Sequence, residues 1–168
     1  TAIVDLYDFY TDYNGGTSNP FSEKLLENSP LSRVFKQAAP GDAWAMGSGK
    51  EIKFDYQTNT SADAVKFFTA TSSWNGEESN KIYNPVLNNL GVYADNELYK
   101  TITKDENHSG TTKNHTTEEF KNKEGQVVLK RTYNTVNNAV QAHDTYYVYD
   151  NYGNLTYVLP PMVETVNS

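Results

Sequence analysis

The sequence predicts a mainly β protein in which antiparallel β-hairpins stack as a twisted sheet or strip. Three observations lead to this prediction. Several segments alternate polar and apolar residues with the period of two that is typical of strands. A short turn motif at residues 150–154 lies between two aromatic-rich segments and has a related copy upstream. Helix signals are few, so we expect at most one or two short helical turns.

The composition favours thin, half-buried layers over a deep apolar core. The chain has 168 residues, among them 13 Tyr, 7 Phe and 2 Trp. Tyrosine packs its ring against neighbours while its hydroxyl reaches water or a polar partner. The net charge of -7 opposes nucleic-acid binding, which usually needs a basic surface. The chain contains no Cys and no apolar run long enough for a membrane span, so a disulfide scaffold and a transmembrane segment are not expected.

Strands are expected along most of the chain, because β-branched and aromatic residues dominate its apolar segments. A short helix is expected at Ser22–Leu26, where Pro30 would stop it, and a single helical turn at Asn84–Leu90. Long polar loops are expected at residues 72–80, 105–114 and 134–143. The expected strands cover residues 51–56, 64–69, 98–104, 116–120, 126–133, 144–150 and 154–159.

The turn motif contains residue types that suit a tight reversal. Asp150 can accept hydrogen bonds from backbone N–H groups, Gly153 can adopt a positive φ, and Asn154 tolerates unusual backbone angles. In the upstream copy, Asn122 aligns with Asp150 and Gly125 aligns with Gly153. A weaker third copy at residues 29–34 has Ser29 in the Asp place and Ser32 in the Gly place. We interpret these residues as turn formers without a catalytic role.

The pattern Tyr149-Asp150-x-x-Gly153-Asn154-Leu155 resembles the YD repeat of the RHS/YD-repeat proteins. The resemblance covers about residues 5–161, although Lys121 and Asn122 replace the Tyr-Asp pair in the upstream copy. It implies the segment that precedes or opens the repeat array of a large exported Gram-negative RHS protein. In that family, stacked hairpins form a shell that can enclose a C-terminal toxin or effector domain, or act at the cell surface. Further matching segments are residues 29–34, 39–44, 54–60, 98–100, 120–131 and 146–161.

This resemblance gives an expected organisation and function. Residues 1–168 would be one β-rich repeat-type segment of a larger protein, with neighbouring repeats as its partners. An opening region at about 1–50 would hold the degenerate repeat, 51–115 hairpins with long polar loops, 116–161 two YD-like repeats, and 162–168 a tail. We expect a non-enzymatic scaffold that is exported, secreted or at the cell surface. Cut from its array, such a strip would expose strand edges, so we also expect a strand-mediated homodimer.

Two alternatives remain open beside the scaffold. Exposed aromatic residues, chiefly Trp44 and Trp74, can stack on sugars, which would suit a carbohydrate- or surface-ligand-binding β module. A hydrolase would need three or more carboxylates or histidines to converge in one pocket. Neighbouring acidic residues such as Glu118 and Glu119 point to opposite faces of a strand, so their adjacency predicts no carboxylate pair.

The remaining candidate motifs predict neither a metal site nor a cofactor site. The only histidines are His108, His115 and His143, and their spacing matches no compact metal-ligand motif. The segment Gly47-Ser48-Gly49-Lys50 resembles the end of a P-loop, but it lacks the upstream glycine and leads into a predicted strand. We therefore expect no catalytic residues, no metal and no cofactor.

Overall fold

A computed structural model describes residues 8–12, 16–76, 78–79 and 82–161. The prediction of a mainly β fold with antiparallel strands is confirmed. Helical residues occur only in short segments of this part of the chain: residues 8–12 and the 3-10 turns η1 (Asp42–Trp44) and η2 (Ser61–Asp63). The predicted tail at 162–168 and the first seven residues of the predicted opening region lie outside the described residues.

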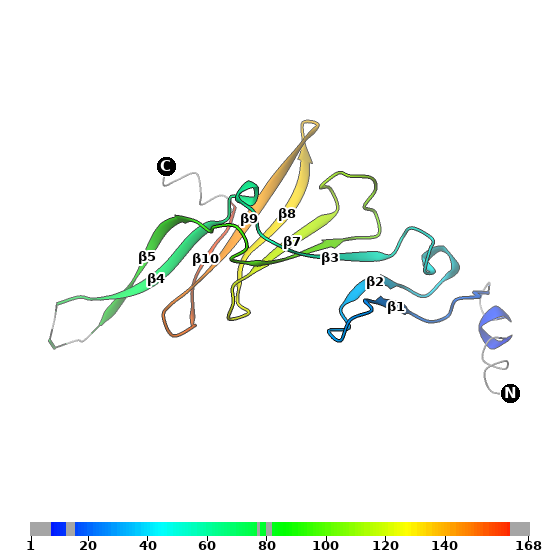
Figure 1. Ribbon diagram of the computed structural model, residues 1–168, viewed down its shortest axis with the longest axis horizontal. Helices are drawn as coiled ribbons and strands as arrows, with labels where there is room; N and C mark the ends of the chain where they lie inside the picture. The colour runs from blue at the N-terminus through cyan, green and yellow to red at the C-terminus, as the bar shows by residue number, and fades with distance from the viewer. Residues whose placement is uncertain (1–7, 13–15, 77, 80–81, 162–168) are drawn as a thin grey trace. The chain divides into compact units, whose positions relative to one another are not determined.

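The chain divides into two compact units. The first contains the described residues up to Asp55 together with Thr103–Thr116, and the second contains Tyr56–Ile102 and the described residues from Thr117 onward. In the first unit, β1 (Glu23–Leu26) pairs with β2 (Val34–Ala38), and β2 pairs with the start of β3 (Ile52–Thr58); both pairs are antiparallel (Figure 1).

The second unit contains most of a meander of strands that follow one another in sequence. β6 (Tyr99–Lys104), β7 (Thr116–Lys121), β8 (Val127–Val136), β9 (Ala139–Tyr149) and β10 (Leu155–Leu159) are neighbours in that order (Figure 1). The end of β6 and the first residue of β7 belong to the first unit. A separate two-stranded antiparallel sheet is formed by β4 (Lys66–Trp74) and β5 (Tyr83–Val92). Because each strand of the meander follows its neighbour along the chain, most pairings need only a short connection.

The hydrophobic core lies in the second unit. Tyr146 is buried within it, with its ring edge-on to Phe68 at 5.1 Å between centroids. The Tyr146 hydroxyl accepts a hydrogen bond from the Lys66 N–H at 3.3 Å and donates one to Asp144 Oδ2 at 3.4 Å. Tyrosine thus fills apolar space while its polar end is satisfied, as a thin aromatic-rich core requires. The buried members of this core are Val65, Leu98, Phe120, Val128, Leu129 and Tyr146.

Three local expectations from the sequence are wrong. The helix expected at Ser22–Leu26 is strand β1, because four residues paired with β2 gain more than an isolated helical turn, which is costly to nucleate. The turn expected at Asn84–Leu90 lies inside β5, where Pro85 is tolerated because a two-stranded sheet has a free edge on each strand.

The long loop expected at residues 134–143 is also wrong, because β8 and β9 continue through most of it. They end at Val136 and Ala139, and only Asn137 and Asn138 connect them. Both connecting residues have positive φ, 51° and 63°, which is the backbone geometry of a two-residue hairpin turn. An asparagine-rich composition is typical of irregular loops, which is why the sequence predicts a loop here. Asparagine also tolerates positive φ, and at Asn137 and Asn138 this property allows a tight turn.

Candidate ligand-binding site and the repeated turns

Asp150 closes the turn between β9 and β10 with both carboxylate oxygens. Its Oδ1 accepts hydrogen bonds from the backbone N–H groups of Tyr152 at 2.9 Å and Asn154 at 2.8 Å. Its Oδ2 accepts one from the Asn154 side-chain amide at 3.0 Å. These bonds, that of the Asn154 side chain foremost, lower the pKa of Asp150 because they favour the charged form. Gly153 has φ of 82° and donates its N–H to the Asp150 carbonyl at 3.0 Å.

The turn between β7 and β8 repeats this scheme with amides. Asn122 Oδ1 accepts the Gln126 N–H at 2.9 Å, and the Gly125 N–H donates to the Asn122 carbonyl at 3.0 Å. Gly125 has φ of 81°, close to that of Gly153. The Asn122 side-chain amide donates to Gln126 Oε1 at 2.8 Å. Asn122 therefore occupies the place of Asp150, and Gln126 that of Asn154.

The turn between β1 and β2 keeps part of the scheme. Ser29 Oγ accepts the Leu31 N–H at 3.2 Å, and the Ser32 N–H donates to the Ser29 carbonyl at 3.0 Å. Ser32 has a positive φ of 49°, at the place that Gly occupies in the other turns. The hairpin closes further out, where the Glu27 N–H donates to the Arg33 carbonyl at 2.9 Å. This turn is therefore wider than the other two.

A bidentate ion pair holds the wider turn. Arg33 Nε lies 2.9 Å from Glu27 Oε1, and its Nη2 lies 2.8 Å from Oε2. The hydrogen bond from Arg33, followed by that from Ser29, lowers the pKa of Glu27 to about 2. All three hairpins also have a shift of strand register next to their turn.

The turns at Asn122 and Asp150 lie side by side in the second unit. The Gln126 side-chain amide of the first donates to the Gly153 carbonyl of the second at 3.3 Å. The Tyr149 hydroxyl donates to the Val127 carbonyl at 3.1 Å. Successive hairpins are thus joined at their turn ends by side chains as well as by strand pairing.

The two turns line a cavity of about 630 Å³, here called the turn cavity. This volume lies in the range of small-molecule sites. Burial, and next the charges of Glu97 and Glu124, raise the pKa of Tyr93 to about 12. The Tyr93 hydroxyl therefore stays protonated at neutral pH and can donate a hydrogen bond. Aromatic and polar residues both line the cavity, including Phe67, Tyr93, Tyr147, Tyr152, Asn122 and Glu124.

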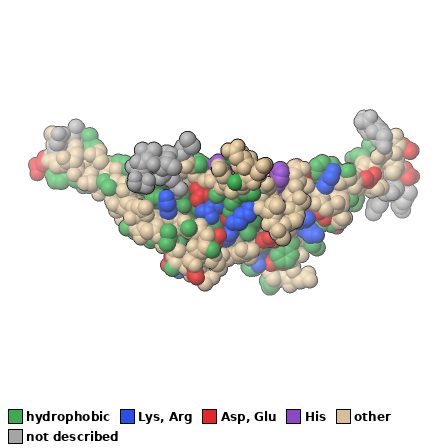
Figure 2. All heavy atoms as spheres, turned by 90° about the horizontal axis from the view of Figure 1, so that it is seen from above, with side chains coloured by type: hydrophobic (Ala, Val, Ile, Leu, Met, Phe, Trp, Pro, Cys, Tyr) green, Lys and Arg blue, Asp and Glu red, His purple; other side chains and the backbone are tan. Residues whose placement is uncertain are grey.

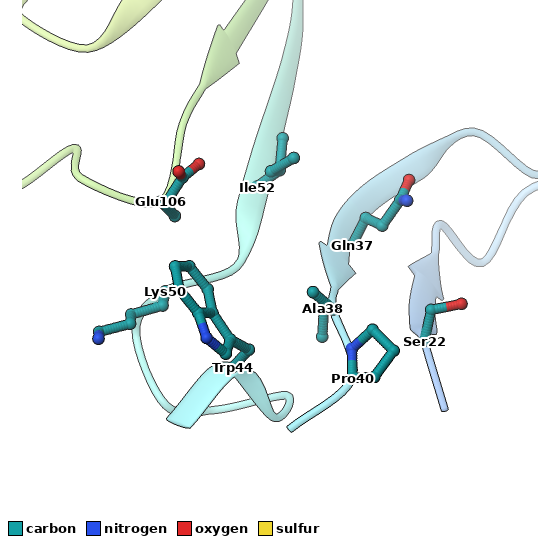
Figure 3. Close-up of a pocket in the computed structure, with 9 residues that line it drawn as sticks. Ser22, Gln37, Ala38, Pro40, Trp44, Lys50, Ile52 and Glu106 are labelled. Carbon is teal, nitrogen blue, oxygen red and sulfur yellow. The ribbon is translucent and has the colours of Figure 1, made fainter. Parts of the chain in front are cut away.

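A second cavity, the Trp44 pocket, lies in the first unit and has a volume of about 370 Å³. Figure 3 shows Trp44, Lys50, Ile52 and Glu106 on one side, facing Pro40 and its neighbours on the other. Lys50 Nζ lies 5.0 Å from the centre of the Trp44 ring, within the range of a cation–π contact. The pocket combines an aromatic surface with one basic and one acidic side chain.

The two tryptophans predicted as stacking residues lie in different units and different surroundings. Trp44 ends η1 and lines the pocket, whereas Trp74 ends β4 and lines neither of the two cavities. Both side chains are exposed at the edge of these elements. Only Trp44 therefore combines exposure with a concave site.

Two of the three histidines, His108 and His115, form local contacts in the first unit, whereas His143 lies on β9 in the second. His108 Nδ1 lies 3.2 Å from the Asn114 carbonyl, and His115 Nδ1 lies 3.3 Å from Asp105 Oδ2. Burial lowers the pKa of His108, which favours its neutral form. Within the described part of the chain, no group of three or more His, Cys, Asp or Glu side chains is arranged to hold a metal ion.

Sequence reasoning missed a buried charge cluster in the second unit. Lys100 Nζ lies 2.6 Å from Asp63 Oδ1 and 3.4 Å from Glu118 Oε2. Beside it, Arg131 forms a bidentate pair with Asp144, with both distances at 2.7 Å. Burial raises the pKa of Asp63, but the hydrogen bonds from Lys100 and Thr60, together with the charges of Lys100 and Arg131, outweigh it and the net pKa is lowered. Lysine and glutamate in alternating strands normally face water, so no sequence signal marks this cluster.

Hydrophobic side chains also reach the surface. Figure 2 shows them at many points among polar atoms on the face in view. On β10, Leu155 and Val158 are both about half exposed. Among the described residues, no helix combines the length and the apolar character needed to cross a membrane.

Comparisons with known proteins reach only part of the chain. A family model described as a domain of unknown function, DUF6443, matches residues 1–58. This match ends at Thr58, the last residue of β3, close to Asp55, where the first segment of the first unit ends. No curated protein and no solved structure gave a significant match. By sequence, therefore, the opening third of the chain is similar to a domain whose function has no description.

Proposed function

We propose that this chain is a non-enzymatic structural segment of an exported RHS/YD-repeat protein. One observation carries the proposal: two successive hairpins end in turns with the same hydrogen-bond scheme, and Gln126 of one turn binds the backbone of the next. Contacts of this kind fix the position of one repeat against its neighbour. Neighbouring repeats of the same protein would be the main partners.

The chemistry of the turn residues supports a structural role. Both oxygens of Asp150 are occupied by three hydrogen bonds from its own turn. These bonds keep the carboxylate charged, so it is a weak proton acceptor at neutral pH. Asn122 takes its place in the turn between β7 and β8, which keeps the backbone hydrogen bonds and the positive φ of the glycine. Since an amide, which does not ionise, can fill this position, the role of the residue is to hold the turn by hydrogen bonds and does not depend on gaining or losing a proton.

The wider role follows from the resemblance to the family. In this proposal the hairpins form part of a shell or stalk at the cell surface or in a secreted protein, where the shell can surround a C-terminal effector or toxin domain. The DUF6443-like opening would begin this segment.

The test is a structure of the chain together with the residues that flank it in its parent polypeptide. Cryo-electron microscopy should show further hairpins that continue from β10, with their turns aligned to the Asp150 turn. A parent without further turns of this type, or a linker that separates this chain from an unrelated fold, would contradict the scaffold role.

A second candidate function is binding of carbohydrate or another surface ligand. The Trp44 pocket favours it, because an exposed indole beside Lys50 and Glu106 offers a stacking surface with hydrogen-bonding groups. The turn cavity offers a similar mixture of rings and amides.

A glycan array tests this second function. Binding should be lost in Trp44→Ala and kept in Trp74→Ala, which removes an exposed tryptophan that lines neither cavity. If the wild-type chain binds no glycan, or if both variants bind equally well, the Trp44 pocket is not a carbohydrate site.

A further inference from the structure

The buried charge cluster brings an amine and two carboxyl groups together in the second unit. Lys100 Nζ lies 2.6 Å from Asp63 Oδ1 and 3.4 Å from Glu118 Oε2. The side chains of Lys100, Asp63 and Glu118 are only 8%, 10% and 4% exposed. We propose that Lys100 Nζ and Asp63 Cγ join in an intramolecular amide bond, an isopeptide cross-link, with Glu118 carrying the proton.

The fold holds the reacting groups from three elements. Asp63 ends η2, where its Oδ2 accepts the Thr60 N–H at 2.9 Å in a capping box. Arg131 Nη1 donates to the Asp63 carbonyl at 3.0 Å and so fixes the backbone of the same residue. Lys100 and Glu118 come from β6 and β7, which are neighbouring strands.

Such fixed geometry replaces a collision between two free groups. Well-oriented groups within one molecule react as if one were present at roughly 10⁵–10⁸ M. The amine and the carboxyl group are 37 residues apart in sequence, so only the fold brings them together. The Thr60 N–H points at Oδ2 and would stabilise negative charge on that oxygen when the amine attacks.

The reaction needs no oxidant, reductant or activated donor. Glu118 accepts a proton from the Lys100 ammonium and passes it to the Asp63 carboxylate, which leaves a neutral amine and a neutral carboxyl group. The neutral amine attacks Cγ to form the C–N bond. Glu118 then takes a proton from the attacking nitrogen and delivers it to the departing hydroxyl group, the C–O bond breaks, and one water molecule leaves. The products are an amide, a water molecule and a Glu118 carboxylate with its original charge.

Burial lowers the cost of converting the ion pair to the neutral reactants. An ion pair in a protein interior keeps a large desolvation cost, whereas proton transfer within the pair leaves two neutral groups and the same net charge. Lys100 Nζ also lies 5.2 Å from the centre of the Phe120 ring, which excludes water from one side. Hydrogen bonding lowers the pKa of Asp63, so the reactive neutral form is a minor one and the cross-link forms slowly, once per molecule.

A second lysine–aspartate pair in the first unit serves as a matched control. Lys104 Nζ lies 2.6 Å from Asp55 Oδ2, the same distance as in the buried pair. These side chains are 29% and 41% exposed, so water stabilises the charged forms. The proposal therefore expects an amide at Lys100 and none at Lys104.

The experiment is an intact-mass measurement on the purified, denatured full chain after incubation at neutral pH, followed by proteolysis and tandem mass spectrometry. The wild-type chain should be lighter than its sequence mass by one water molecule, with a linked peptide that joins Lys100 to Asp63. Lys100→Arg keeps the positive charge and should have the full sequence mass. Lys104→Arg should still lose the water.

Several results would overturn the proposal. A wild-type chain with its full sequence mass after prolonged incubation excludes the bond, and this reading depends on no variant. Loss of water with a linked peptide that lacks Lys100, or with an altered Asp elsewhere, assigns the loss to other chemistry. If Glu118→Gln still forms the cross-link completely, Glu118 does not carry the proton and the proposed mechanism is wrong.

Discussion

Single residues decide how each of the three turns is closed. A carboxylate holds the Asp150 turn, an amide holds the Asn122 turn, and a hydroxyl holds the Ser29 turn. The weaker the acceptor, the more the turn depends on other contacts, which in the Ser29 turn are those between Glu27 and Arg33. A turn geometry can thus persist after its characteristic aspartate is replaced.

The two turn glycines allow a matched stability test. In Gly153→Ala the new Cβ would lie 3.1 Å from Gln126 Nε2, whereas in Gly125→Ala it would meet nothing within 4 Å. Positive φ costs each alanine about 1–2 kcal/mol. Urea unfolding should therefore show a larger loss of stability for Gly153→Ala. Equal losses would mean that the Gln126 contact between the turns contributes nothing.

The ion pair of the Ser29 turn predicts a pH dependence. The pKa of Glu27 is lowered from 4.5 to about 2 in the folded chain. Between these two pH values, the unfolded chain therefore binds a proton at Glu27 more readily than the folded chain does. The stabilisation is complete above pH 4.5 and is lost as the pH falls toward 2. The difference in unfolding free energy between wild type and Glu27→Gln should shrink over this window. A difference that stays constant would contradict the assignment.

The roles of turn residues could be predicted from sequence because turn chemistry is local. Asp150 bonds groups within four residues of itself, so the motif alone implies its partners. Lys100 and Glu118 could not be predicted in this way. Their partners depend on which strands become neighbours and on which face of the sheet η2 covers. Neither can be predicted from a short segment of sequence.

At the scale of elements, hairpins formed where the period-two pattern and the turn residues agreed. The strands from β6 to β10 correspond to expected segments, since each alternates and ends at a turn signal. β1 and β5 were missed because a short apolar segment fits a helix or a strand, and only pairing with a partner strand decides. The cavities also depend on pairing, so their position could not be read from the chain.

A hydrogen bond between β10 and β5 helps to join the two-stranded sheet to the meander, beside that between Lys66 and Tyr146, and it can be tested alone. The Tyr157 hydroxyl on β10 donates to the Pro85 carbonyl on β5 at 2.8 Å. Tyr157→Phe should speed hydrogen exchange in β5, with a loss of about 0.5–1.5 kcal/mol of local stability. Tyr83→Phe alters an exposed ring on the same strand and serves as the control. Unchanged exchange in both variants would show that β5 is held by its other contacts.

At the scale of the whole molecule, the open end of the meander predicts self-association. Among the described residues β10 pairs with β9 alone, and it exposes Leu155 and Val158. An unpaired edge invites pairing with a second chain. Light scattering should therefore show a dimer whose population rises with concentration.

Charge on this edge should prevent the dimer. The double variant Leu155→Lys, Val158→Lys should be monomeric, because lysines on an edge strand oppose further pairing. Tyr152→Lys adds a charge at the exposed turn instead and should leave the dimer intact. A wild-type chain that is monomeric at every concentration would show that the edge is protected.

The division of the core between the units has a spectroscopic consequence. The buried apolar cluster lies in the second unit, whereas Ala38 is the one buried apolar side chain among the described residues of the first. Trp44 belongs to the first unit and Trp74 to the second, and the chain has 2 tryptophans. Each unit therefore carries its own intrinsic fluorophore. The Trp74→Phe variant keeps only Trp44 and reports on the first unit, and the Trp44→Phe variant keeps only Trp74 and reports on the second. The fluorescence of Trp74→Phe should change at a lower urea concentration than that of Trp44→Phe. Transitions at the same urea concentration would show that the two units unfold together.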